Sequence, residues 1–149
     1  MKNTLLAILL LATGEFALAQ GRHQAPPTRV RQSFQRDFPG ASDTRWSQSG
    51  NQWHANFTDR SPEDRGEMVA YYDGNGRHID SHIPYAQQDV PQPVYSSARK
   101  RYHDDRMEFT RVEHPTRGDY FEVRARVHGK IRTSYYDENG HERHYYNRH

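Results

Sequence analysis

The sequence contains no cysteine, which excludes both a disulfide framework and the acylated cysteine of a bacterial lipoprotein. It also lacks a long apolar run: the stretch at residues 5–12 is far shorter than the roughly 20 residues that a membrane-spanning helix needs. No leucine occurs after Leu18. The rest of the chain must therefore build its core from Phe, Trp, Tyr, Val and Ile, and most of these residue types favour β-strands.

The first 19 residues have the pattern of a cleavable signal peptide. Lys2 precedes the apolar run, and Ala17-Leu18-Ala19 matches the small-x-small site that signal peptidase cuts. We expect cleavage near Ala19, no membrane insertion, and a mature protein that is periplasmic or secreted.

The charge balance argues against a nucleic-acid partner. The chain has 21 Lys and Arg against 19 Asp and Glu, so its formal net charge is only +2, and both signs are interspersed. The mean hydropathy of −1.18 would be compatible with disorder. An aromatic fraction of 12% is too high for a typical disordered chain, and we expect a folded domain.

Two parts of the chain show the same order of predicted elements. The four-residue spacing of an amphipathic helix occurs at Val30, Phe34 and Phe38, and again at Val94, Ala98 and Tyr102. Alternating strands at 53–57 and 120–127 and Asp-x-Asn-Gly turns at 73–76 and 137–140 follow each helix.

The predicted fold is α+β, with two tandem units, each a helix packed on an antiparallel meander of three or four strands. The first unit covers residues 30–88 and the second covers 89–149, after a flexible lead-in at 20–29. Whether the two units share one sheet stays open at this stage.

Several motifs carry a family resemblance: Phe34-x-x-x-Phe38-Pro39-Gly40-Ala41, Trp46-Ser47, Gly50-Asn51-x-Trp53-x-Ala55-x-Phe57 and Tyr71-Tyr72-Asp73-x-Asn75-Gly76. With them the chain resembles the β-lactamase-inhibitor-like, PepSY-like family of bacterial periplasmic proteins, over residues 30–146. The second unit is more diverged, because it lacks the Phe-Pro-Gly-Ala turn and any tryptophan. The resemblance implies tandem helix-plus-sheet repeats, export, no enzymatic activity and a role in binding or inhibiting another protein. It brings no catalytic residues.

Catalytic and cofactor motifs are missing from the sequence. There is no Gly-x-Ser-x-Gly elbow and no cysteine nucleophile, and the acidic residues are scattered among arginines. We expect neither enzymatic activity nor a cofactor.

The ten histidines raise the question of a metal site. His78 and His82 share a face of a predicted strand but lie too far apart to bind one ion. His141, His144 and His149 are accompanied by no cysteine and no His-Glu-x-x-His helix. We interpret the histidines as solvated surface residues and predict no metal site.

The two Asp-x-Asn-Gly loops are predicted to be hairpin turns rather than calcium sites. A calcium loop of the EF-hand type that opened at Asp73 or Asp137 would need a glutamate where the sequence has Pro84 or Arg148.

One face of the predicted sheet is left without a helix. If Trp53, Tyr71, Phe121 and Tyr135 point at the helices, the opposite face carries His54, Met68, Tyr72, Tyr120, Arg124, Arg126, Arg132 and Tyr136. Tyr, Arg and Met are enriched at protein interfaces, so this face is a candidate partner-binding surface. An ordinary solvent-facing sheet surface is the alternative.

The sequence thus predicts an exported protein-binding module, an inhibitor or sensor of an unidentified envelope protein. The alternative is a small-ligand or metal-ion sensor of the periplasm that uses the histidines and a cleft between the units.

Overall fold

The computed structural model describes residues 25–60, 66–103 and 106–144. The predicted signal peptide at 1–19 and the first half of the predicted lead-in, residues 20–24, lie outside them. No helix among the described residues is long and apolar enough to cross a membrane. The elements follow in the order α1 (Thr28–Asp37), β1 (Ala41–Ser49), β2 (Gln52–Asp59), β3 (Gly66–Asp73), β4 (His78–Tyr85), the 3-10 turn η1 (Gln87–Asp89), α2 (Gln92–Tyr102), β5 (Met107–Glu113), β6 (Tyr120–Val127), β7 (Lys130–Tyr136) and β8 (Glu142–Arg143).

All eight strands belong to one antiparallel sheet in the order β1 to β8, so the prediction of two tandem helix-plus-meander units is wrong. The predicted boundary between the units falls between β4 and β5. These two strands pair directly, from Ser81 opposite Glu113 to Tyr85 opposite Phe109. Two separate meanders would each expose an additional edge of unpaired backbone groups, and pairing β4 with β5 removes both edges.

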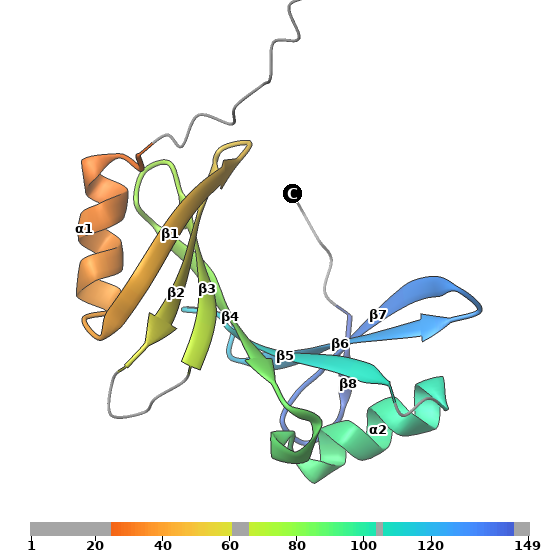
Figure 1. The fold of residues 1–149 in the computed structure, drawn as a ribbon. Helices are drawn as coiled ribbons and strands as arrows, with labels where there is room; N and C mark the ends of the chain where they lie inside the picture. Colours follow the sequence, from red (N-terminus) through yellow and green to blue (C-terminus); the bar gives the residue numbers. More distant parts are fainter. Residues whose placement is uncertain (1–24, 61–65, 104–105, 145–149) are drawn as a thin grey trace, which may run out of the picture.

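Both helices form where the four-residue apolar stripes predicted them. Val30 and Phe34 are buried on α1, and Val94 and Ala98 are buried on α2. Proline precedes each helix, at Pro27 and Pro91, where its fixed φ suits a helix start. Figure 1 shows that the sheet is strongly bent and that the helices lie on its outer side.

Apolar side chains under the helices form two clusters on the helix-bearing face of the sheet. The α1 cluster is held by rings in contact, with Phe34 lying 4.9 Å from Phe57 and 5.1 Å from Trp46 between ring centroids. The buried members under α1 are Val30, Phe34, Phe38, Trp53, Ala55, Phe57, Met68, Ala70, Tyr72 and Ile83. Those under α2 are Val90, Val94, Ala98, Met107, Phe109, Phe121, Val123, Ala125 and Tyr136.

The β3–β4 turn lies against the start of α1. Asp73 accepts backbone hydrogen bonds from Asn75 at 2.8 Å and from Arg77 at 3.0 Å, and Arg29 Nε donates to the carbonyl of Gly74 at 2.7 Å. Asp137 organises the β7–β8 turn through the same two contacts, to Asn139 and His141. The predicted hairpin turns are therefore present, and each aspartate serves its own turn.

Candidate functional site

The face of the sheet opposite the helices carries a second set of aromatic and ionisable side chains. Figure 1 shows this face turned toward the inside of the bend, and we call it the concave face. The strand registers place its members between the buried residues of each strand. Its central members are His54, Val69, Tyr71, Asp80, His82, Val112, Tyr120, Glu122 and Tyr135.

A row of three rings crosses β2, β3 and β4 on the concave face. The Tyr71 ring lies 4.6 Å from the His54 ring and 4.7 Å from the His82 ring, between centroids. All three side chains are half-buried. Asp80 Oδ1 lies 3.4 Å from His82 Nε2 and adds a negative charge beside the row. The three rings thus form a pre-packed, partly apolar patch with polar atoms at its margin.

The concave face continues across β5, β6 and β7. Val112 lies in register between His82 and Tyr120, and it is fully buried although neither α1 nor α2 covers this face. The Tyr120 and Tyr135 rings make an edge contact with centroids 5.8 Å apart. Aromatic side chains therefore occur on both halves of the sheet, with a buried valine between them.

His54 is held in its neutral form. Burial lowers the pKa of His54 below its ordinary value, and the nearby charge of His82 acts in the same direction, although Asp80 opposes the shift. The Nε2 atom of His54 is buried and has no hydrogen-bond partner among the described residues. Because Nε2 is buried, a ligand can contact the half-buried ring of His54 but not this nitrogen.

Tyr71 keeps its proton under all ordinary conditions. Burial raises the pKa of Tyr71, and the negative charges of Asp80 and Glu122 raise it further. Its hydroxyl is therefore a hydrogen-bond donor and acceptor, and the ring supplies apolar contact area.

The structure places three of the predicted partner-binding residues on the concave face: Tyr120, Arg124 and Arg126. His54, which was predicted to lie on the same face, lies there too. Arg124 lies opposite Glu108, with 3.7 Å between Nη1 and Oε2, and both side chains are exposed. Arg126 donates to the carbonyl of Gly129 at 3.2 Å, near the end of its hairpin.

The face predicted for Met68, Tyr72 and Tyr136 is wrong. They are 2%, 0% and 2% exposed and belong to the helix-covered core, so none of them can contact a partner directly. Tyr72 donates a hydrogen bond to Asp37 on α1, which confirms its inward direction. The prediction assigned the alternating residues of the strand to the wrong faces of the sheet. Tyr71 and Tyr72 are adjacent and of the same type, so alternation alone does not show which of them faces the helices.

Because of that error, the prediction missed Tyr71 and Tyr135, which it had placed against the helices, and also His82. The strand pairing contains the missing signal. Trp53 pairs with Tyr72 and His54 pairs with Tyr71, and paired residues share a face of the sheet. Because Trp53 was correctly predicted to face the helices, its pairing places Tyr72 on the same face and Tyr71 on the opposite one.

A bulge separates His78 from His82, which were predicted to share a face. Tyr71 pairs with Asp80 while Tyr72 pairs with His78, so one extra residue enters β4. His78 consequently packs under α1, with its ring 5.1 Å from Tyr72 and 5.7 Å from Phe38, while His82 lies on the concave face.

The interpretation of all histidines as solvated surface residues is wrong for His54, His78, His82 and His114, because each is half-buried. Among the described residues there is no group of three or more metal-ligating side chains.

A serine and a histidine meet below the sheet surface. His78 Nε2 lies 2.8 Å from Ser81 Oγ, a distance that suits nucleophile activation. Ser81 is 0% exposed, however, so a substrate cannot reach its hydroxyl. The bond lies within β4 and satisfies the buried hydroxyl of Ser81 and a ring nitrogen of the half-buried His78.

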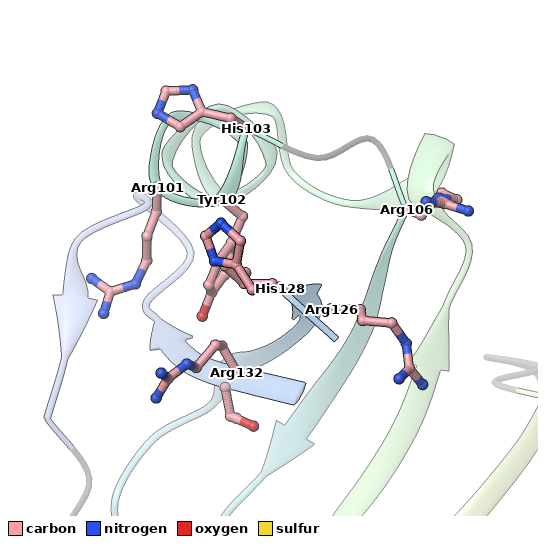
Figure 2. Close-up of a pocket in the computed structure, with 9 residues that line it drawn as sticks. Arg101, Tyr102, His103, Arg106, Arg126, His128 and Arg132 are labelled. Carbon is pink, nitrogen blue, oxygen red and sulfur yellow. The ribbon is translucent and has the colours of Figure 1, made fainter. Parts of the chain in front are cut away.

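Arg132, the remaining predicted residue, lies on the helix-bearing face opposite Ala125. It lines an open groove of about 900 Å³ between the end of α2 and the β6–β7 hairpin, shown in Figure 2. The lining is strongly basic: it consists of Arg101, Tyr102, His103, Arg106, Arg126, Val127, His128, Arg132 and Thr133, and we call it the basic groove.

No protein-family model and no curated protein matches the chain. Solved structures do match. A BLIP-like protein from Bacteroides fragilis has a TM-score of 0.70 at 19% identity, over 83% of this chain and 86% of that protein. A DUF2874 family protein from Bacteroides ovatus has a TM-score of 0.69 at 18% identity, over 80% and 85%. A proposed periplasmic protein from Bacteroides eggerthii has a TM-score of 0.67 at 15% identity, over 80% and 86%.

At these identities the likeness concerns the fold. It extends over 80% or more of this chain and 85% or more of each of these proteins. The neighbours are consistent with the β-lactamase-inhibitor-like family that the sequence motifs resemble, and that resemblance is confirmed.

Proposed function

We propose that this chain is an exported protein that recognises another protein of the periplasm through its concave face and performs no chemistry of its own. The observation that carries the proposal is the row of His54, Tyr71 and His82, packed ring against ring on the sheet face opposite α1 and α2.

The composition of the face supports protein recognition. Tyrosine offers a large contact area at a small cost in side-chain entropy and is enriched at binding hot spots. The rings occupy the centre of the face, whereas exposed charges such as Glu108 and Arg124 lie toward its margin. An apolar centre with a polar rim is the usual anatomy of a protein interface.

The comparisons support a protein partner as well. One structural neighbour is BLIP-like and another is a proposed periplasmic protein. Inhibition of an envelope enzyme is the specific form of recognition that this likeness favours. We propose that the Tyr71 hydroxyl is a polar group that contacts the partner, with the His54 ring beside it as apolar contact area.

Site-specific crosslinking tests the proposal. A photoreactive phenylalanine analogue replaces Tyr71 in cells that make the native protein, and the same analogue replaces Gln35, an exposed residue of α1, as the control. We expect one dominant crosslinked protein from position 71 and none from position 35. Equal crosslinking at both positions would contradict recognition by the concave face.

The same partner must then respond to substitution. In a purified pair, Tyr71→Ala should weaken binding by about 2 kcal/mol or more, as for a hot-spot tyrosine. Arg77→Ala, an exposed change in the β3–β4 turn, is the matched control and should leave the affinity unchanged. An unchanged affinity in Tyr71→Ala would refute the proposed contact.

A further inference from the structure

We propose a second interaction surface, at the outer edge of β7 beside the basic groove, which binds an extended acidic segment of a protein as an added β-strand. This surface lies apart from the centre of the concave face, and the inference does not depend on the proposed function.

The edge of β7 is only partly covered. Among the described residues, β8 pairs with β7 through Tyr135 and Tyr136 alone. Residues 130–134 of β7 therefore have a strand neighbour, β6, on one side.

The turn before β7 determines which backbone groups face outward. His128 and Gly129 have φ of 49° and 78°, the signs of a type I′ two-residue hairpin turn. In such a hairpin the residues that flank the turn form a hydrogen-bonded pair, and the pairs then alternate. Ile131 and Thr133 consequently direct their N–H and C=O groups away from β6. Within the described residues no strand pairs with these groups, and another strand can bond to them.

The charge beside this edge selects the kind of strand. Four arginines and two histidines line the basic groove, and none of its nine lining residues is acidic. The whole chain has a net charge of only +2, so this concentration does not follow from composition. In the sequence Asp104 and Asp105 lie between His103 and Arg106, outside the described residues.

The positive charges of the groove are only partly compensated. Arg101 pairs with Glu142 at 2.8 Å, and Arg126 donates to the backbone carbonyl of Gly129. Arg132 has neither an ion pair nor a side-chain hydrogen bond within the part of the chain that the structure describes. Figure 2 shows Arg132 and Arg101 directed toward the same side of the groove. Uncompensated guanidinium groups there favour a carboxylate-bearing ligand.

The groove and the strand edge form one continuous surface. Arg101 and Thr133 line the basic groove and also a neighbouring hollow that reaches Glu142 and Arg143 of β8. Ser134 Oγ and Tyr102 Oη are buried beside these hollows without a hydrogen-bond partner in the described residues. Ile131, 47% exposed, is the large apolar side chain that the described surface exposes, and it lies on this same edge.

Charge also distinguishes between the strands that could pair with the edge of β7. A second copy of this chain would bring Lys130 and Arg132 against the same residues, and the two edges would repel each other. Residues 145–149 contain Arg148 and His149 and no acidic side chain. An acidic strand from a partner protein is attracted by the groove and pairs with the edge. Side chains of alternate residues lie about 6.6 Å apart on one face of a strand, so carboxylates at every second position can reach successive arginines.

The probe is a fluorescent peptide, Thr-Glu-Val-Glu-Val-Glu-Thr, titrated into the mature chain at low salt, with anisotropy as the measurement. Two control peptides have the same length: one has Gln in place of Glu, and the other keeps the charge but is N-methylated at alternate residues, which removes the hydrogen-bond donors of one edge. We expect saturable binding of the acidic peptide and at least about fivefold weaker binding of either control.

Protein variants separate the groove from general charge. Arg132→Gln should weaken peptide binding at least about fivefold, whereas Arg124→Gln, which removes the same charge outside the groove, should change it less than twofold. Equal losses in the two variants, or equal binding of the N-methylated peptide, would show nonspecific attraction and overturn strand addition. Tyr71→Ala, which tests the concave face, should leave peptide binding unchanged.

Amide hydrogen exchange tests the edge itself. The amides of Ile131 and Thr133 should exchange fast in the free full-length protein and slowly with the peptide bound. Slow exchange at both amides without peptide would mean that the chain covers its own edge, for example with residues 145–149, and would refute the proposal.

Discussion

The hydroxyl of Tyr72 donates a hydrogen bond to Asp37 Oδ2 at 3.0 Å and so joins β3 to the last residue of α1. Burial raises the pKa of Tyr72 strongly, and the negative charge of Asp37 raises it further, so the phenol remains the donor. Tyr71, the preceding residue, faces the opposite side of the sheet and has no such bond to a helix. Two adjacent tyrosines therefore have different physical roles.

Removing only the Tyr72 hydroxyl should destabilise the protein. Tyr72→Phe keeps the ring in the α1 cluster but deprives Asp37 of its donor, and we expect a loss of about 1.5 kcal/mol in the free energy of unfolding. Tyr71→Phe is the matched control and should lose less than about 0.5 kcal/mol. Urea unfolding followed by tryptophan fluorescence measures both. Equal losses would show that the bond to Asp37 adds nothing to stability.

Gly76 should tolerate no side chain. It has a φ of +85°, and a Cβ there would lie 2.8 Å from the carbonyl oxygen of Arg29, so Gly76→Ala would force the β3–β4 turn away from α1. We expect a loss of about 3 kcal/mol or more, combining backbone strain with a steric clash. Gly50→Ala has a similar positive φ with no atom near the new Cβ, and should cost about 1 kcal/mol. Thermal unfolding measures the stability of both variants. If Gly50→Ala destabilised the protein as much as Gly76→Ala, the close approach of Gly76 to α1 would not contribute to the loss.

Mild acid should weaken the fold through His78. Burial lowers the pKa of His78 below its ordinary value, although Asp37 and Asp80 act in the opposite direction. Because the unfolded chain binds this proton more readily, the stabilising contribution is complete above about pH 6.5 and is lost as the pH falls through that value toward the folded-state pKa.

Urea titrations at about pH 7.5, 6 and 5 should therefore show a falling free energy of unfolding, and His78→Gln should flatten this dependence. Gln can still bond to Ser81, so the comparison isolates the titration. His54 has a pKa lowered for the same reason, so part of the slope will remain. A slope identical to that of the unaltered protein would contradict the role given to His78.

Arg111 should not be replaceable by lysine. It pairs with Ile83 and Phe121 where the two halves of the sheet meet, and its Nη2 lies 2.8 Å from Asp119 Oδ2. That bond raises the pKa of Arg111 above its ordinary value. Arg111→Lys loses the planar fork, so we expect about 1 kcal/mol less stability, against less than about 0.5 kcal/mol for Arg124→Lys on the exposed surface. Chemical denaturation of both variants measures these losses, and equal small effects would show that the bond from Arg111 to Asp119 adds nothing to stability.

Local signals in the sequence were sufficient for part of the fold. Apolar residues at every fourth position predicted both helices, because an amphipathic stripe needs only neighbouring residues. The Asp-x-Asn-Gly turns were also predictable, since one aspartate bonds to the backbone of its own turn.

Features that depend on distant contacts were not predicted. β1 has a single large apolar residue, Trp46, and β5 lies beyond α2 without a turn motif before it, so neither strand was identified. The pairing of Ser81 with Glu113 joins segments that no local pattern relates. The bulge in β4 and the inward direction of Tyr72 are likewise set by the partner strands and by Asp37.

Each strand of the sheet pairs only with the strands before and after it in the chain. Every strand pair except β4–β5 therefore joins strands that are connected by a turn or a loop, and hairpins of this kind form within microseconds. The pairing of β4 with β5 is different, because η1 and α2 lie between them and a long loop must close before Tyr85 meets Phe109. Formation of this central pair is thus the step expected to limit the folding rate, and the bend that creates the concave face is completed only when that pair has formed.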